Sequence, residues 1–264
     1  KDATEAKLAA VKEVRNVINQ KLDELLSSGQ LTHSLTRNSE DPTQYSILIQ
    51  KDLSSTSLEN GFYKYPVVTI TPTSNDGILA GDDYIYKQSF STVYARNWLV
   101  GSNYDEKFKR GGSFRVSYIA GNPTIQIPSE GSATYTGKAF NADNRGNFEY
   151  NVNFATRQGS GRIYALDNNL PEIYLDKNTD ENTMIQGRVL NQETVMKITS
   201  SASINNKQVG QYTLGFFGDN AQDIAGEVYI DQELPNAVRT NGNTQERYEG
   251  KVRGVVFAVA GTKE

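Results

Sequence analysis

The most informative stretch of this chain reads Gly215-Phe216-Phe217-Gly218-Asp219-Asn220-Ala221-Gln222-Asp223-Ile224-Ala225-Gly226-Glu227-Val228. It predicts a strand that ends in two aromatic residues and a glycine. A short polar turn follows, with one helical stride at 221–224, and a glycine then leads into another strand. Glycines allow a strand to bend, and aromatic residues can close the end of a core. Because the stretch carries no base, nucleophile or metal-ligand cluster, it predicts an architectural corner in a closed antiparallel sheet.

The composition favours a mainly β protein. The 264 residues include 22 glycines, 15 tyrosines and 10 phenylalanines, and they can bury one large core or two modest ones. The formal net charge of −4 disfavours a nucleic-acid partner, because such binding needs concentrated Lys and Arg. No cysteine is present, which excludes disulfides, thiolate metal sites and cysteine nucleophiles. No apolar run is long enough to span a bilayer as a helix.

An amphipathic α-helix is predicted at residues 3–28, within an N-terminal helical segment 1–30. Its apolar residues recur every three or four positions and share one stripe: Leu8, Val11, Val14, Ile18, Leu22 and Leu25. Charged residues, Lys21 among them, fall mainly on the other side. The stripe predicts packing on the rest of the chain, and a partner-facing helix is the alternative.

A β-rich host-interaction domain is predicted at residues 31–128. It opens with a polar linker at 30–44, and strands follow at 45–50, 62–71, 84–99 and 113–119. Aromatic residues occupy even positions of the third strand, which would place them on one face that lines the core: Tyr84, Tyr86, Phe90, Tyr94 and Trp98. Alternatively, Tyr94, Trp98 and Tyr104 would contact a partner, because Tyr and Trp are enriched at protein interfaces.

A more regular pattern begins after a boundary at residues 122–131. Strands are predicted at 133–140, 148–154, 161–166, 184–190, 195–202, 208–217, 225–230 and 252–260, with a long polar loop at 232–250. Eight short antiparallel strands favour an up-and-down β-barrel at residues 129–264, whose last strand pairs with the first. Four apolar residues alternate with polar ones in the second strand: Phe148, Tyr150, Val152 and Phe154. They would pack the core or, alternatively, line a lumen that holds a small apolar ligand.

The residues indicate no catalytic centre. His33 is the single histidine and lies in the polar linker, away from any strand–elbow–helix context for a serine nucleophile. Asp219 and Asp223 flank the corner turn without the spacing of a calcium loop. We therefore assign no catalytic residue, metal or cofactor, and we expect a binding protein rather than an enzyme.

Three segments together resemble a known family. They are Tyr86-Lys87-Gln88-Ser89-Phe90-Ser91, the strand residues 133–140 continuing through 148–155 and 159–163, and the stretch at 215–228. In this order and spacing they resemble the transferrin-binding-protein-like surface lipoproteins. That family includes the lobes of transferrin-binding protein B, factor H binding protein and the hemophilin-type haem and haemoglobin binders.

The resemblance implies an eight-stranded C-terminal barrel that serves as a scaffold and an N-terminal domain that binds a host molecule. It further implies export by a Slam-type translocon and a lipid anchor on a cysteine that would precede Lys1. The protein would be displayed on the outer face of a Gram-negative outer membrane, with a role in host association, colonisation or symbiosis.

The resemblance leaves two alternatives for the ligand: complement factor H, or haem or another small apolar molecule carried as in hemophilins. The N-terminal helix departs from factor H binding protein and is more similar to host-colonisation lipoproteins of symbiotic bacteria. Because His33 precedes the first predicted strand, an axial histidine ligand for haem is disfavoured, and tyrosine ligation is left open.

Overall fold

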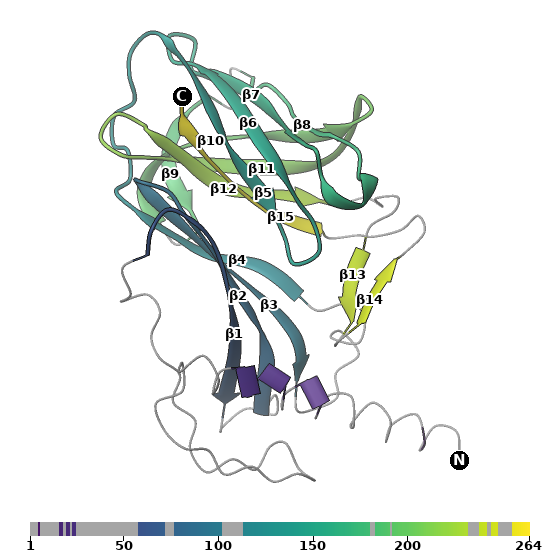
Figure 1. The fold of residues 1–264 in the computed structure, drawn as a ribbon. Helices are drawn as coiled ribbons and strands as arrows, with labels where there is room; N and C mark the ends of the chain where they lie inside the picture. Colours follow the sequence, from purple (N-terminus) through teal and green to yellow (C-terminus); the bar gives the residue numbers. More distant parts are fainter. Residues whose placement is uncertain are drawn as a thin grey trace.

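The computed structural model describes residues 5, 16–17, 20–21, 23–24, 58–71, 77–101, 113–179, 183–190, 192–231, 238–241, 244–247 and 255–264. These residues form mainly strands, as predicted, in a four-stranded sheet beside a barrel (Figure 1). Those described at 5–24 are helical, in agreement with the predicted helix, and none belongs to a helix long and apolar enough to cross a membrane. The linker at 30–44, the strand at 45–50, His33 and Tyr104 lie outside the described residues.

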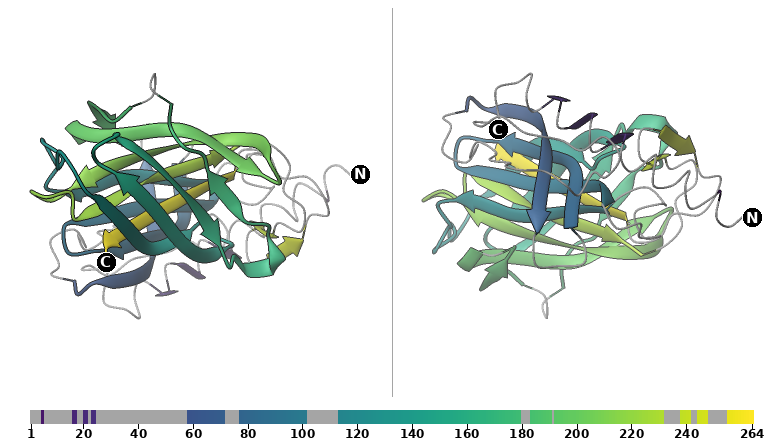
Figure 2. Two further views of the ribbon diagram at one scale, coloured as in Figure 1. Left: turned by 90° about the horizontal axis from the view of Figure 1, so that it is seen from above. Right: turned by 90° about the horizontal axis from the view of Figure 1, so that it is seen from below.

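Eight antiparallel strands close the C-terminal barrel, which confirms the predicted fold. In ring order they are β5 (Ser132–Phe140), β6 (Arg145–Asn153), β7 (Gln158–Tyr164), β8 (Ile173–Leu175), β10 (Gln192–Ile204), β11 (Lys207–Phe217), β12 (Asp223–Ile230) and β15 (Val255–Lys263). The ring closes because β15 pairs with β5, as Figures 1 and 2 show.

One predicted barrel strand lies outside the ring. The strand predicted at 184–190 forms β9 (Ile185–Val189), which pairs with the first part of β10 beside the ring. Its expected place is taken by β8, which follows the short 3-10 turn η1 (Asp167–Asn169) and pairs with β7 and β10. At three residues, β8 is too short to show an alternating pattern. The predicted polar loop at 232–250 is also corrected, since it contains the hairpin of β13 (Val238–Asn241) and β14 (Thr244–Arg247).

The barrel interior is filled by side chains that alternate along the strands. Phe148, Tyr150 and Val152 point inward from β6, and Phe154 follows just after that strand. All four are buried in one core cluster. The hydroxyls of Tyr150 and Tyr212 are hydrogen-bonded at 2.8 Å, and Tyr212 Oη donates to the Asp176 carbonyl at 2.6 Å. Burial raises the pKa of both tyrosines.

The corner between β11 and β12 differs from the prediction in two details. No helical stride occurs at 221–224, because Ile224 already belongs to β12. The turn is made instead by Gly218, whose φ of 93° favours glycine, and by Ala221 with φ of 50°. The two aromatic residues also point in opposite directions, because consecutive strand residues alternate faces. Phe216 lies in the barrel core, whereas Phe217 packs outside it against the sheet.

The N-terminal sheet is an antiparallel meander of β1 (Gly61–Thr71), β2 (Gly77–Lys87), β3 (Ser91–Gly101) and β4 (Ser113–Gly121). The single strand predicted at 84–99 is therefore wrong, because the chain reverses at residues 88–90. Phe90 lies in that turn and is 40% exposed. The carboxylate of Asp223 accepts hydrogen bonds from the Phe90 N–H at 2.8 Å and from Ser91 Oγ at 2.9 Å, so a distant residue stabilises the turn.

One face of this sheet packs on the outside of the barrel (Figures 1 and 2). Tyr84, Phe114 and Phe62 gather around the barrel residue Phe140, and the Phe62 and Phe140 rings lie 5.0 Å apart. The guanidinium of Arg145 lies 3.8 Å from the centre of the Phe62 ring. Small barrel residues complete the contact: Ala225, Ala258 and Ala260. The sheet and the barrel therefore share a second hydrophobic core, which leaves the opposite sheet face turned away from the barrel.

Candidate functional site

The sheet face turned away from the barrel carries a row of cross-strand aromatic neighbours. Tyr63, Ile85, Tyr94 and Tyr118 lie opposite one another on β1, β2, β3 and β4. The Tyr94 and Tyr118 rings are stacked at 4.5 Å, and Tyr63 stacks on Tyr65 at 6.2 Å. Ile85 is buried between its neighbours, whereas the four tyrosines are half-exposed. The row therefore presents ring edges and hydroxyls above an apolar base.

Next to this row, an ion pair and a tryptophan continue the same face. Arg96 on β3 contacts Asp83 on β2 through two parallel bonds, Nε to Oδ1 at 2.5 Å and Nη2 to Oδ2 at 3.0 Å. The guanidinium carbon of Arg96 also lies 5.0 Å from the centre of the Trp98 ring. This two-sided contact orders the arginine while its side chain stays 37% exposed.

We call this surface the outer sheet face and define it by seven side chains: Tyr63, Tyr65, Asp83, Tyr94, Arg96, Trp98 and Tyr118. All of them are half-exposed. Tyr, Trp and Arg are the residues that contribute most to protein–protein binding energy. Rigid aromatic side chains also lose little conformational entropy when a partner orders them. The chemistry of this face is therefore that of a protein-binding surface.

The structure brings together two of the three aromatic residues predicted to face a partner. Tyr94 and Trp98 both lie on the outer sheet face, and Tyr104 falls outside the described residues. The predicted shared face with Tyr84 and Tyr86 is wrong, since those two side chains pack toward the barrel. The cause is the turn at 88–90, which separates the two pairs onto different strands.

Sequence reasoning missed the other members of the outer sheet face. Tyr63 and Tyr65 alternate with Phe62 and Lys64 on a strand that was predicted, so a period of two already separated their faces. Tyr118 and Arg96 could not be assigned in the same way, because their partners depend on the register across β3 and β4. Register shifts at Ala80/Gly81 and at Tyr94/Ala95 alter that pairing.

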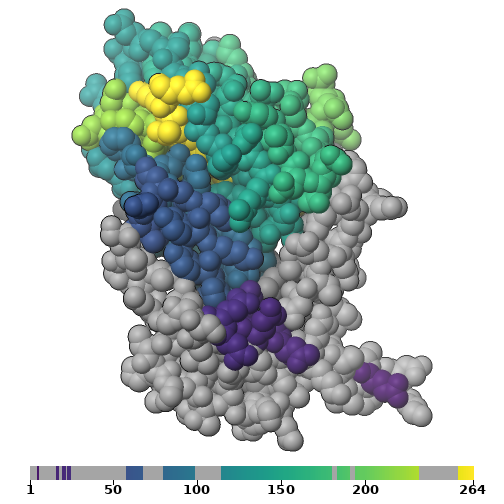
Figure 3. Space-filling view, in the orientation of Figure 1, coloured from purple at the N-terminus to yellow at the C-terminus, as the bar shows by residue number. Residues whose placement is uncertain are grey.

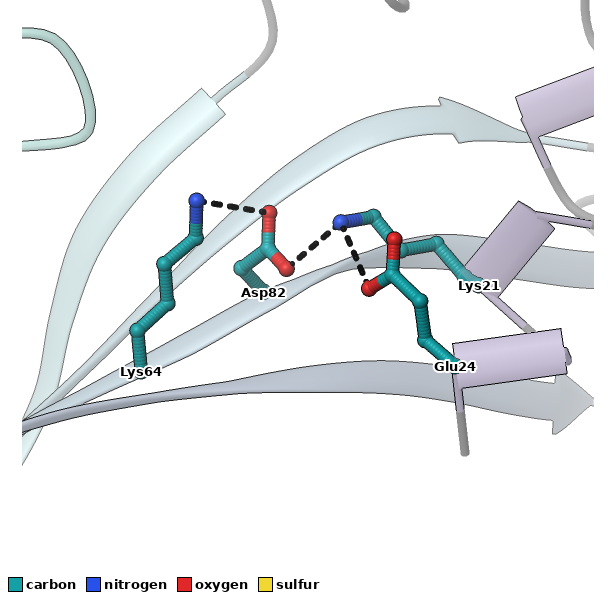
Figure 4. A network of polar contacts seen from close by, with 4 residues as sticks. All are labelled: Lys21, Glu24, Lys64 and Asp82. Carbon is teal, nitrogen blue, oxygen red and sulfur yellow. Dashed lines mark hydrogen bonds and ion pairs between the residues drawn. The ribbon is translucent and has the colours of Figure 1, made fainter. Parts of the chain in front are cut away.

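The opposite, inner face carries a polar network where the sheet extends below the barrel (Figure 4). Lys21 Nζ lies 2.7 Å from Asp82 Oδ1 and 3.4 Å from Glu24 Oε2, and Lys64 Nζ lies 3.9 Å from Asp82 Oδ2. In Figure 3 the larger purple patch, which is formed by the described residues at 16–24, lies directly against the blue strands of the sheet. Lys21, expected on the polar side of the helix, is thus buried against β2. This contact supports packing of the helix on its own chain.

The described residues show no arrangement for metal chemistry. No group of three or more His, Cys, Asp or Glu side chains in the described ranges is placed to hold a metal ion. The four barrel residues considered as lumen lining, Phe148, Tyr150, Val152 and Phe154, are between 0% and 3% exposed and pack among other core side chains. Their positions support core packing, and carriage of a small ligand stays an untested prediction.

Comparison with known structures finds similar chains, and the following three are among them. The apo haemoglobin receptor HpuA from Kingella denitrificans is 12% identical, with 77% of this chain and 84% of that chain covered and a TM-score of 0.35. A structure described as a surface lipoprotein is 12% identical, with 85% and 92% covered and a TM-score of 0.38. HpuA from Kingella denitrificans in complex with human haemoglobin is 13% identical, with 78% and 85% covered and a TM-score of 0.33.

Comparison with protein families gives a match in the barrel half. The model of the factor H binding protein C-terminal domain matches residues 125–228, from the segment before β5 to within β12. The matched region includes the corner at 215–228 and ends before β15. Residues 125–228, which include most of the barrel, are therefore similar to the C-terminal domain of factor H binding protein.

Proposed function

We propose that this chain is a surface lipoprotein that binds a host protein through the outer sheet face, with the barrel as scaffold. The observation that carries the proposal is the ordered set of half-exposed Tyr, Trp and Arg side chains on a face turned away from the barrel. The inner face is covered by the barrel and contacted by Lys21. The outer sheet face is thus the surface of the sheet best suited to a large partner.

The family match supports the class of partner. The matched family is named for a protein that binds factor H, a host protein, and the match lies in the barrel. The outer sheet face lies before residue 125 and outside the matched region. Factor H is therefore the first specific ligand to test. A different host protein would be consistent with the same scaffold.

The same proposal favours binding over catalysis. The described part of the chain offers a rigid aromatic surface, which suits recognition of a protein partner. Host association or colonisation is the biological role that such binding would serve. Lipid anchoring at the outer membrane and export by a Slam-type translocon belong to the same proposal, on the strength of the family.

Surface display can be tested by protease shaving of intact bacteria that carry the full-length protein. Added protease should remove the protein from whole cells while a periplasmic control protein stays intact. Equal protection of both proteins would contradict surface display.

Ligand binding can be tested with the purified chain immobilised on a sensor. The probes are purified factor H and haemoglobin, followed by host plasma with identification of retained proteins by mass spectrometry. We expect saturable retention of at least one of these proteins. If no host protein is retained above a surface that carries an unrelated β protein, the proposed function is wrong.

A further inference from the structure

The inner face of the N-terminal sheet contains a buried polar pair below the region that packs on the barrel. Asp82 on β2 and Asn97 on β3 are direct cross-strand neighbours, and they are 4% and 2% exposed. Phe114 continues the row on β4, with its ring 5.8 Å from that of Tyr84. The bulge beside this row depends on Gly81, because a Cβ there would lie 2.0 Å from the Asn97 carbonyl oxygen. The backbone thus places a carboxylate and an amide side by side under the aromatic core.

Lys21 of the N-terminal helix fills this position. Its ammonium group lies 2.7 Å from Asp82 Oδ1, and the residue is only 7% exposed (Figure 4). Lys64 approaches the other carboxylate oxygen from a half-exposed position, and Glu24 contacts the same ammonium from the helix. Lysine is almost never buried to this degree without a partner of opposite charge. The ion pair with Asp82 therefore explains why the Lys21 side chain can be buried.

The energetics indicate that this contact determines position more than stability. A buried ion pair gains little net free energy, because removal of both charges from water offsets their attraction. Loss of one partner, by contrast, leaves the other charge buried and unpaired, which is strongly unfavourable. Lys21 consequently has one preferred place on the sheet, against Asp82.

Asn97 is a second buried polar side chain beside the ion pair. Its Nδ2 atom is buried and has no hydrogen-bond partner in the described part of the chain. Buried donors are normally paired, because an unpaired one loses its hydration without compensation. The Lys21 ammonium group offers donors only and cannot pair with this Nδ2 atom, so Asn97 is a polar neighbour of the ion pair and not part of it.

We propose that Asp82 is the docking site for a basic side chain on the inner face, and that Lys21 is its intramolecular occupant. The N-terminal helix is then a strap docked on the inner face. Together with the barrel it occupies the inner side of the sheet and leaves the outer sheet face for a partner. The docking itself does not depend on the proposed function, and it can be tested without any host ligand.

Acylation of lysines in the folded full-length chain, read out residue by residue with mass spectrometry, tests the docking. Acetyl N-hydroxysuccinimide ester is the probe, and the exposed Lys207 at the start of β11 is the reference. We expect Lys21 to react at least about tenfold more slowly than Lys207, as a group that reacts only after local opening. Equal rates at the two lysines would overturn the proposal.

Asp82→Asn and Asp83→Asn form a matched pair of variants, because the two residues are adjacent on β2 and face opposite sides of the sheet. Asp82→Asn should raise the reaction rate of Lys21 to that of Lys207, whereas Asp83→Asn, which disturbs the Arg96 pair, should leave Lys21 protected. Lys263 in the barrel donates to the Asn220 carbonyl at 2.6 Å and reports on the global fold. Equal effects of both variants on Lys21, with Lys263 unchanged, would contradict the proposal.

If Asp82→Asn also raises the acylation rate of Lys263, the variant has disturbed the barrel as well. The charge-swapped double variant then tests the proposal. In Lys21→Asp/Asp82→Lys the pair is restored with reversed polarity. The proposal then expects the introduced lysine to be protected and Lys263 to regain its wild-type rate. An introduced lysine that reacts as fast as Lys207 in a chain with protected Lys263 would overturn the proposal.

Discussion

Among single residues, Asp223 makes the contact that joins the corner of the barrel to the N-terminal sheet. It is fully buried, and one carboxylate oxygen accepts hydrogen bonds from the Phe90 N–H and from Ser91 Oγ. Gln88 adds a bond to the Ile224 carbonyl at 3.4 Å. The hairpin turn between β2 and β3 is thus held against β12.

Asp223→Ala should destabilise the chain by about 2 kcal/mol, the range for hydrogen bonds to a charged group. The matched control is Asp219→Ala at the other end of the same turn, where an exposed carboxylate accepts one bond from Asn122. A surface change of this kind should alter stability by less than about 0.5 kcal/mol. Urea denaturation followed by tryptophan fluorescence measures both, and equal effects would contradict the assigned role of Asp223.

Gly226 and Gly215 test the close packing of the corner. A Cβ on Gly226 would lie 1.9 Å from the Thr213 carbonyl oxygen, which belongs to the neighbouring strand and cannot move away. A Cβ on Gly215 would lie 3.3 Å from the Phe217 ring, which can shift slightly. We expect Gly226→Ala to cost about 1–3 kcal/mol in the free energy of unfolding, as overpacked sites do, and Gly215→Ala clearly less.

This comparison uses thermal melts of both variants under the same conditions. A Gly226→Ala protein that melts at or above the temperature of Gly215→Ala would contradict the strand geometry of the corner.

Single residues also show where prediction from sequence ends. The period of two placed three residues of β6 on one face: Phe148, Tyr150 and Val152. The structure confirms this prediction, because a barrel strand has one face toward the core and one toward solvent. The direction of Phe217 was not predicted, since it depends on a sheet that covers the barrel from outside. The pairing of Lys21 with Asp82 could not be predicted from the sequence either, because it joins residues 61 positions apart.

At the scale of elements, the β2–β3 hairpin shows why strand prediction failed between residues 84 and 99. Its turn, Gln88-Ser89-Phe90, contains no Gly, Pro, Asn or Asp and only Ser89 among the common turn residues, so the local turn signal is weak. Hydrogen bonds from the turn to Asp223 replace local turn chemistry. The short β8 was missed for a related reason, because its position is set by pairing with β7 and β10.

Strand β12 supplies a prediction about pH. Burial raises the pKa of Glu227 on this strand, while the positive charge of Arg115 opposes the shift. A carboxyl group with a raised pKa binds its proton more tightly in the folded state. Its contribution to stability is therefore fully present below the ordinary Glu pKa and is lost as pH rises through the folded-state pKa.

Glu227→Gln removes this titration and should make the chain more stable than wild type at neutral pH. The difference should shrink as pH falls below the ordinary Glu value of about 4.3. Melting temperatures of both proteins across this pH range measure the effect. A wild-type protein that gains stability relative to the variant as pH rises would contradict the buried position of Glu227.

At the scale of the whole molecule, the structure combines a barrel whose residues 125–228 match a known family model with a sheet that lies outside the matched region. The barrel and its similarity to the factor H binding protein C-terminal domain could be predicted from sequence, because the strands alternate regularly and the motif at 215–228 lies in the matched region. The proposed binding surface could be predicted only in part, through Tyr94 and Trp98. Its remaining members are assembled by register across four strands, which no local pattern encodes.

The central claim is that the outer sheet face, and not the barrel surface, binds the host protein. The decisive measurement is the affinity of the full chain for a host protein retained from plasma, compared between Tyr94→Ala/Trp98→Ala and the control Tyr174→Ala. Tyr174 is a 47% exposed tyrosine on barrel strand β8, so the control removes a similar side chain from the scaffold. We predict that the double variant weakens binding at least about tenfold, as loss of hot-spot residues does, and that the control binds like wild type. Unchanged binding by the double variant, or equal losses in both proteins, would contradict the claim.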